Sequence, residues 1–246
     1  ATYSLDSTSR VQYNMNGNQT VFGGITYGRL YLSSGAATVT KTLNGNISVL
    51  DSLSLGLRAS LDASLSNYNI SLKGHLVLNN IASSLLTRRD NTFTFNGNNA
   101  QTVTYAAGGT LSFYNLAINN SNGVTFASHT MIDSVRNTLT ISSGNLTLGT
   151  GNSWRFGGSA SYPGGTGTIT GSTTTNLTLY GTAATDTLRL PSAIASRRFN
   201  NLILNRTGTT RSVVVTGTND SLEVYGTLTL TKGIMRMGAN KMVLMN

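Results

Sequence analysis

Apolar and polar residues alternate in short runs along almost the whole chain. Clear examples are Leu139-Thr140-Ile141, Leu146-Thr147-Leu148 and Leu228-Thr229-Leu230. Alternation with a period of two indicates a β-strand that buries one face. Asn-Gly, Gly-Asn and Ser-Gly pairs interrupt the runs every few residues, and these residues readily adopt the positive backbone dihedral angles of tight corners. The pattern therefore predicts many short strands joined by sharp turns.

A longer pattern repeats above this alternation. Three stretches beginning at Val49, Val135 and Val224 share a short strand, a Gly or Ser turn, a second strand, an Asn/Gly turn and a third strand. Leu53, Leu139 and Leu228 take one equivalent position, and Ile70, Trp154 and Met242 take another. A unit that recurs in this way is a structural unit of a stacked architecture. Because Trp154 replaces aliphatic residues at its position, we expect it in the core.

Other correspondences extend the repeat over most of the chain. Gln19-Thr20-Val21 matches Gln101-Thr102-Val103, and three further segments match one another at even spacing: Tyr27-Gly28-Arg29-Leu30, Phe113-Tyr114-Asn115-Leu116 and Phe199-Asn200-Asn201-Leu202. We predict an all-β fold, a right-handed parallel β-helix (β-solenoid) built from three long repeats of about 80–88 residues. A single solenoid would cover 11–246, with repeats at approximately 11–91, 92–165 and 166–246, and 1–10 would form an N-terminal cap or linker. With roughly 20 residues per coil, each repeat would hold about four coils.

Composition limits the surface chemistry. Charged residues are only 10% of the chain, about a quarter of the residues are Ser or Thr, and there is no cysteine, which excludes disulfides and thiolate metal sites. No apolar run is long enough for a transmembrane helix, and Ala1 is compatible with a removed signal peptide. The net charge of +9 comes from basic residues scattered mostly singly along the chain, which favours a solvated surface; a face that binds a polyanion is the alternative, and no nucleic-acid-binding signature accompanies the charge. The candidate polyanion contacts are Arg155, Arg189, Arg197 and Arg198.

The chain lacks the residue clusters that hydrolases and lyases of β-helical fold use. Its eight acidic residues lie far apart in sequence, apart from Asp220 and Glu223. His75 and His129 have no acidic neighbour in sequence, so we interpret them as surface or corner residues. No nucleophile elbow, phosphate loop or His-Glu-x-x-His motif is present. We therefore expect no enzyme, no catalytic or metal-binding residues and no cofactor.

One pattern does stand out among the acidic residues. Five of the seven Asp residues are followed by Ser or Thr and then by an aliphatic residue or Thr. This resembles the O-glycosylation sequence of exported proteins of Bacteroidota. The resemblance implies glycans on Ser7, Ser52, Ser134, Thr187 and Ser221. The alternative is that an Asp-Ser pair simply forms a turn before a strand.

The repeat itself resembles a known family. The segments GTLTLTKGIMRMGANKMVLMN at 226–246 and NGNNAQTVTYAAGGTLSFYNLAINNSNG at 96–123 are similar to the parallel β-helix repeat regions of adhesin-like secreted and cell-surface proteins of Bacteroidota, cargo of the type nine secretion pathway. The resemblance implies an extracellular location at the bacterial cell surface. Such proteins usually end in a sorting domain that is not seen here, so a fragment or processed form is expected.

We therefore expect an extracellular structural or adhesive repeat protein, a stalk, fibre or sheath subunit. The repeat runs to Met245-Asn246 without a capping helix or charged strand, which predicts head-to-tail stacking with another copy or with adjoining repeats of a longer chain. Copies could also assemble side by side. We do not expect nucleic acid as a partner. The alternative is a module that binds glycan, such as surface polysaccharide, on one solenoid face. A polysaccharide-degrading enzyme and an ice-binding protein are less favoured, since Thr-x-Thr triplets such as Thr38-Val39-Thr40 and Thr138-Leu139-Thr140 fall at different repeat positions.

Overall fold

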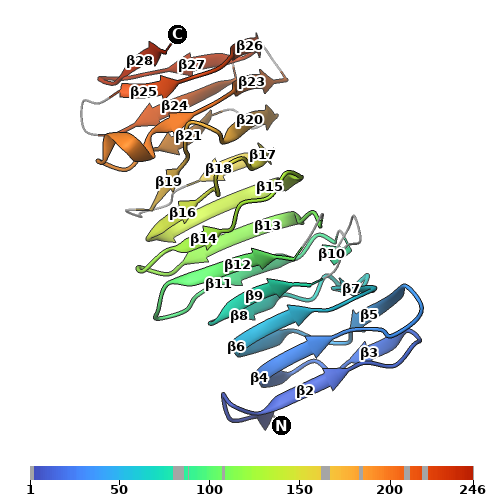
Figure 1. The fold of residues 1–246 in the computed structure, drawn as a ribbon. Coiled ribbons are helices and arrows are strands. Elements are labelled where there is room, and N and C mark those ends of the chain that lie inside the picture. Colours follow the sequence, from blue (N-terminus) through green and yellow to red (C-terminus); the bar gives the residue numbers. More distant parts are fainter. Residues whose placement is uncertain are drawn as a thin grey trace.

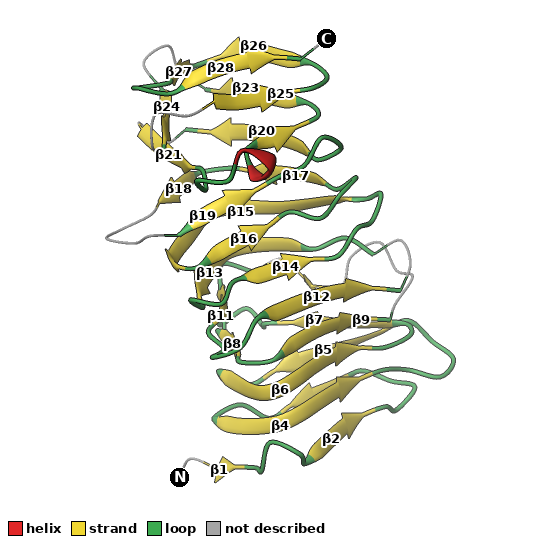
Figure 2. Ribbon diagram, turned by 60° about the vertical axis from the view of Figure 1, so that its left-hand side comes forward, coloured by secondary structure: helices red, strands yellow, loops and turns green. Residues whose placement is uncertain are grey.

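The strands wind into an elongated stack of parallel coils. A computed structural model describes residues 3–79, 86–87, 89–106, 109–161, 167–182, 185–207, 211–217 and 221–245. Paired strands run parallel, and the two termini lie at opposite ends of the stack (Figure 1). The only helical element of the described residues is one 3-10 turn, Ile194–Ser196, red in Figure 2. The predicted all-β parallel solenoid is confirmed.

Each coil passes in turn over three faces, which we number in chain order. Face 1 contains β1 (Tyr3–Ser4), the first halves of β4 (Ile25–Leu32) and β6 (Ile47–Leu55), β8 (Ile70–Leu72), β11 (Thr92–Phe95), the second halves of β13 (Ser112–Asn119) and β15 (Ile132–Ser143), β18 (Ser159–Ser161), β21 (Thr185–Arg189), β24 (Ser212–Thr216) and β27 (Ile234–Arg236). Face 2 contains β2 (Arg10–Tyr13), the second halves of β4 and β6, β9 (His75–Leu78), β12 (Gln101–Tyr105), β14 (Val124–Phe126), β16 (Asn145–Thr147), β19 (Thr168–Thr170), β22 (Arg198–Phe199), β25 (Ser221–Val224) and β28 (Lys241–Leu244).

Face 3 completes each coil and carries the candidate site described below. It contains β3 (Gln19–Val21), β5 (Val39–Leu43), β7 (Ala59–Asp62), β10 (Leu86–Thr87), the first halves of β13 and β15, β17 (Ser153–Phe156), β20 (Asn176–Gly181), β23 (Leu202–Arg206) and β26 (Leu228–Lys232). A coil takes between 19 residues, from Val11 to its partner Leu30, and 27 residues, from Leu76 to Val103.

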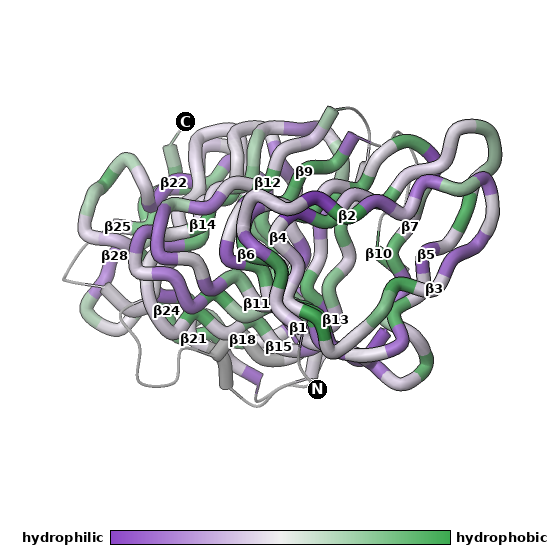
Figure 3. The backbone as a smooth tube through the Cα atoms, turned by 90° about the horizontal axis from the view of Figure 1, so that it is seen from below, coloured by the Kyte–Doolittle hydropathy of each residue, from purple (hydrophilic) through white to green (hydrophobic). Residues whose placement is uncertain are grey.

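The core consists of side chains that point inward from the three faces and stack on like side chains of the next coil. Buried and less buried positions alternate along most strands, as in β5 and β11, because successive strand residues point to opposite sides. The same alternation appears in the hydropathy along the backbone (Figure 3). Trp154 is 1% exposed and meets Phe126 edge-on at a centroid distance of 4.8 Å, so its predicted place in the core is confirmed.

The long repeats do not stack on one another in register. Leu30 and Leu116 are equivalent in sequence, yet Leu30 pairs with Leu53 on face 2, whereas Leu116 pairs with Leu139 on face 1. The third equivalent residue, Leu202, lies on face 3. The equivalent leucines are 86 residues apart (116 − 30 and 202 − 116), and with coils of about 23 residues this spacing corresponds to about three and two-thirds coils. Each long repeat therefore begins one face away from the previous one.

Two of the three matching segments form the same bulged corner at different edges. Pairing shifts between Tyr27 and Arg29 in β4, where the strand passes from face 1 to face 2, and between Phe113 and Asn115 in β13, where it passes from face 3 to face 1. An extra residue at a bulge bends the strand. The corner in β4 requires a glycine, because a Cβ on Gly28 would lie 2.0 Å from the carbonyl oxygen of Asp6.

Candidate functional site: a basic groove on face 3

The outer surface of face 3 is hollowed between β13 and β26. A hollow of about 750 Å³ is lined by outward residues of β13, β15, β17, β20 and β23, among them Arg136, Arg155 and Tyr180. A second hollow of about 350 Å³ continues it toward β26 and shares Ile132, Arg155, Thr178 and Ile203 with the first. We call the two hollows together the face 3 groove.

The two arginines of the groove come from successive coils. Arg155 pairs with Ser134 of the coil before it, and Arg136 lies two residues beyond Ser134 on the same strand. Both arginines are exposed, and neither has a carboxylate partner among the described residues. Because strands of one sheet lie about 4.8 Å apart, the two guanidinium groups can reach one bound chain. No Asp or Glu is among the described residues that line the groove, so its charge is positive.

A tyrosine ring lies across a glycine on the groove wall. A Cβ added to Gly157 would lie 2.6 Å from the Cζ atom of Tyr180, so the ring rests against the backbone where a side chain is missing. Arg206, itself 1% exposed, donates from Nη1 to the carbonyl oxygen of Tyr180 at 3.2 Å. The strand that carries the ring is therefore held from the interior.

A ladder of amide and hydroxyl groups borders the arginines. Asn176 donates to the hydroxyl of Ser153 at 3.0 Å, Asn201 donates to Oδ1 of Asn176 at 2.8 Å, and the backbone N–H of Thr227 donates to Oδ1 of Asn201 at 2.8 Å. These residues occupy one outward position on four successive coils. The ladder fixes the amide orientations, and its outer hydrogen-bonding capacity faces the groove.

The remaining predicted polyanion contacts do not share this surface. Arg189 is in β21 on face 1, and Arg198, in β22 on face 2, donates from Nε to Glu223 at 2.9 Å. Arg197 is only 3% exposed. Of the four candidate polyanion contacts, Arg155 lines the groove, Arg189 and Arg198 lie on other faces and Arg197 is buried, and the structure places Arg136 beside Arg155. The strand register that brings these two together was not visible in the sequence.

The Asp-Ser/Thr motifs occupy unrelated environments. Ser7 is exposed in a turn where Asp6 accepts a bond from the N–H of Thr8 at 2.8 Å. Ser52, Ser134, Thr187 and Ser221 are half-buried in strands, and Ser134 donates to the hydroxyl of Ser112 at 3.0 Å inside the groove. Asp220 lies outside the described residues, and nothing is described of the Asp186 side chain. Glycosylation of the five residues remains a prediction.

His129 lies in the corner between β14 and β15, one of the two places expected for it, but its side chain is buried and not at the surface. Its side chain is 5% exposed, and its Nε2 lies 2.8 Å from Oδ2 of Asp133, which is itself fully buried. The Tyr105 hydroxyl donates to the same carboxylate oxygen at 2.6 Å, and the Tyr105 and His129 rings stack at 3.9 Å. The Leu111 N–H satisfies the other oxygen at 2.8 Å. Asp133 is thus a buried polar centre rather than part of an open site, whereas His75 is exposed as expected.

Burial and the nearby carboxylate perturb the pKa of Tyr105. Burial raises it well above the usual range, and the charge of Asp133 and the hydrogen bond to that carboxylate add to the effect. Both act against loss of the phenolic proton. The network therefore holds a neutral Tyr105 as a donor inside the solenoid.

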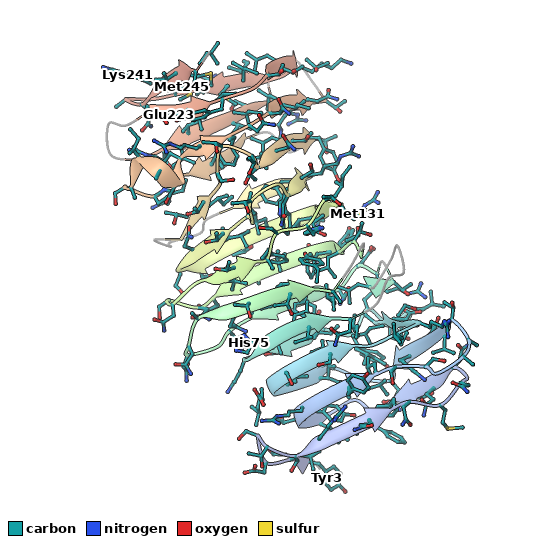
Figure 4. The ribbon with its side chains drawn as sticks, viewed as in Figure 1. Tyr3, His75, Met131, Glu223, Lys241 and Met245 are labelled. Atoms are coloured by element: carbon teal, nitrogen blue, oxygen red, sulfur yellow. The ribbon has the colours of Figure 1, made fainter. Side chains whose placement is uncertain are left out.

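The C-terminal end of the stack is apolar. In the last coil, the inward positions of β26 and β28 show Leu230 at 56% and Leu244 at 58% exposure, where equivalent residues of earlier coils are buried. β26, β27 and β28 each have a strand partner on one side only among the described residues. Figure 4 shows Lys241 and Met245 at this end and Tyr3 at the other.

Other site classes find little support among the described residues. No group of three His, Cys, Asp or Glu in the described parts of the chain could hold a metal ion. None of the helices in those parts is long and apolar enough to cross a membrane. Comparison with protein-family models, curated proteins and solved structures finds no match for this chain. The groove and the C-terminal end of the stack are therefore the surfaces to which a function can be assigned.

Proposed function

We propose that the chain is a structural segment of an extracellular rod, a stalk, fibre or sheath subunit that stacks end to end at a bacterial cell surface. The exposed apolar face of the last coil is the observation that supports this most directly. Leu230, Ile234 and Leu244 are 56%, 39% and 58% exposed at an end where every strand also has an unpaired edge. Open edges and apolar surface together favour continuation by another coil.

The occupant we propose is another coil, either the first coil of a second copy or an adjoining repeat of a longer chain, and a second copy can be tested with this chain. The first strands of a copy, β1, β2 and β3, follow one another around the axis in the same direction as its last strands, β26, β27 and β28. Leu5, Val11 and Tyr13 are partly buried residues that pack on the core from this first coil, and Tyr3 is 65% exposed. Stacking would therefore cover apolar residues at both ends and add a parallel strand on each face. Because the two surfaces differ, the contact does not close and produces filaments.

The test is the assembly state of the purified chain over a wide concentration range, by electron microscopy and sedimentation. We expect filaments whose length increases with concentration. Leu230→Lys places a charge in the contact and should leave monomers. Leu65→Lys adds the same charge at an 83% exposed loop residue away from the ends and should still assemble. A wild-type chain that stays monomeric throughout, or identical behaviour of the two variants, would reject stacking between copies.

Added salt gives a second readout. Each copy carries a net charge of +9, and Lys232, Arg236 and Lys241 are exposed in the last coil. Screening of the repulsion between copies should therefore lengthen the filaments. Shortening on addition of salt would indicate an ionic contact instead of an apolar one.

Surface glycosylation is part of the same proposal. Ser7 is the exposed member of the five predicted positions, so it should show the highest occupancy. Intact-mass measurement on protein from its native source should exceed the 25.9 kDa of the chain, and peptide mapping should find the glycan at Ser7. A mass equal to that of the bare chain excludes the modification.

A further inference from the structure

We infer that the face 3 groove binds an extended acidic polysaccharide. This site is independent of end-to-end stacking, because the groove lies along the side of the solenoid from β13 toward β26. Three observations carry the inference: the charge of the groove, the ring of Tyr180 and the ladder of neutral polar groups.

The charge of the groove selects an anion. Arg136 and Arg155 project from successive coils and lack carboxylate partners among the described residues, whereas other arginines are paired, such as Arg89 with Asp62 and Arg198 with Glu223. A guanidinium group binds a carboxylate or sulfate through two parallel hydrogen bonds. Two such groups on neighbouring coils fit a ligand whose anionic groups recur along a chain.

The neutral groups select a carbohydrate. The Tyr180 ring lies over Gly157 and presents an apolar surface beside the arginines, and Ile132 and Ile203 add to it. Asn176, Asn201 and Ser153 provide amide and hydroxyl groups one coil apart, at the spacing of about 4.8 Å that a parallel sheet imposes. A sugar ring has an apolar face, which can pack on Tyr180, and hydroxyl groups at its edge, which can bond to the amide and hydroxyl groups of the groove.

Single-stranded nucleic acid fits the groove less well. Proteins that bind it combine basic tracks with several aromatic platforms for successive bases. Of the two aromatic residues that line the groove, Tyr180 presents its ring, whereas Trp154 is 1% exposed and packs in the core, and most of the other positions are hydroxyls, amides or isoleucines. The observations therefore favour a polymer of uronic acids.

The binding test uses the monomeric fraction, so that its result does not depend on filament formation. Polygalacturonate is the probe, with its neutral methyl ester and a single-stranded oligonucleotide of similar charge as comparisons. We expect binding of polygalacturonate that weakens with salt, and weaker binding of both comparison polymers. Arg155→Gln and Arg136→Gln should each reduce the affinity about tenfold, as expected when a charge-assisted hydrogen-bonded contact is lost.

Lys73→Gln is the matched control, since it removes one exposed positive charge at the turn between β8 and β9, away from the groove. It should change the affinity less than twofold, as expected for a distant exposed charge. Circular dichroism checks that every variant is folded. No detectable binding of polygalacturonate, tighter binding of the oligonucleotide, or an equal loss from Lys73→Gln and Arg155→Gln would each overturn the inference. Monomers that bind polygalacturonate but never stack would reject the proposed function and leave this site standing.

Discussion

Leu30 and Leu116 occupy the same place in the sequence repeat but stack in different columns of the core. Leu30 lies on Leu53 within face 2, and Leu116 lies on Leu139 within face 1. All four side chains are at most 1% exposed. The inward position of a strand is therefore equivalent on every face, and a repeat can start on any of them without losing its core contacts.

Replacement of Trp154 tests the packing of the middle coils. The ring is 1% exposed and contacts Phe126 and Phe156 at centroid distances of 4.8 and 5.6 Å. Trp154→Ala should lower the free energy of unfolding by about 3–5 kcal/mol, because it leaves a cavity between coils. Urea denaturation followed by circular dichroism measures the loss. Trp154→Phe keeps most of the volume and should cost clearly less, and equal losses would show that cavity size does not determine the effect.

Asp133→Ala should destabilise the chain strongly. The carboxylate is fully buried and is the hydrogen-bond partner of Tyr105, His129 and the N–H of Leu111. Its removal leaves buried polar groups without a partner, and we expect a loss of about 3 kcal/mol or more. Asp6→Ala, at an exposed turn, is the control and should cost much less. Thermal unfolding of the two variants checks the difference.

Stability should fall in alkali because of buried tyrosines. Burial raises the pKa of Tyr105 and that of Tyr27 above the usual value near 10. The unfolded chain loses these protons near pH 10 while the folded chain keeps them, so the stability is complete below that pH and declines as the pH rises further. Urea midpoints measured across this range should show the decline. Tyr105→Phe should reduce its slope, and an unchanged slope would contradict the assignment to Tyr105.

A separate loss of stability is expected in acid. Arg89 donates to both carboxylate oxygens of Asp62 at 2.7 Å, and this contact holds the pKa of Asp62 below its usual value. The folded chain therefore resists protonation, and the contribution of the pair is present above the unfolded pKa near 3.9 and is lost as the pH falls through the folded value. Arg89→Gln should weaken this acid dependence. Lys73→Gln, with the same loss of charge, should leave it intact.

Gly157→Ala should weaken polysaccharide binding without changing any charge. The added Cβ would lie 2.6 Å from the Tyr180 ring and 2.8 Å from the carbonyl oxygen of Arg136, so the ring must move. We expect reduced affinity for polygalacturonate with an unchanged salt slope, because the arginines remain. Gly17→Ala, where no atom lies within 4 Å, should bind as the wild type does. Wild-type affinity in Gly157→Ala would show that the ring position is irrelevant.

The fold was predictable from the sequence because its signals are local. Alternation in segments such as Leu139-Thr140-Ile141 indicates a strand that buries one face. The even spacing of Leu30, Leu116 and Leu202 indicates the long repeat. The register between coils was not predictable, because coils vary from 19 to 27 residues and no single period describes them. The position of equivalent leucines on three different faces could therefore be found only from the pairing itself.

The candidate site was predictable only in part for the same reason. Arg155 was expected at the surface, but its neighbour Arg136 comes from the previous coil and was not recognised. Arg197 and Arg198 are adjacent in sequence, yet one is buried and the other pairs with Glu223. His129 and Asp133 are separated by only four residues, but the sequence did not reveal that a turn folds them together around Tyr105.

The shift of one face per long repeat determines how the rod displays whatever its repeats carry. A group that recurs every 86 residues lies on a different face in each repeat, so three successive copies point to three different sides of the rod. Repetition of the sequence therefore gives radial display around the rod, and a linear array on one side must arise from neighbouring coils that differ in sequence. A flat ligand surface such as an ice plane would meet only one copy of each repeated group, whereas a matrix that surrounds the rod could contact all three.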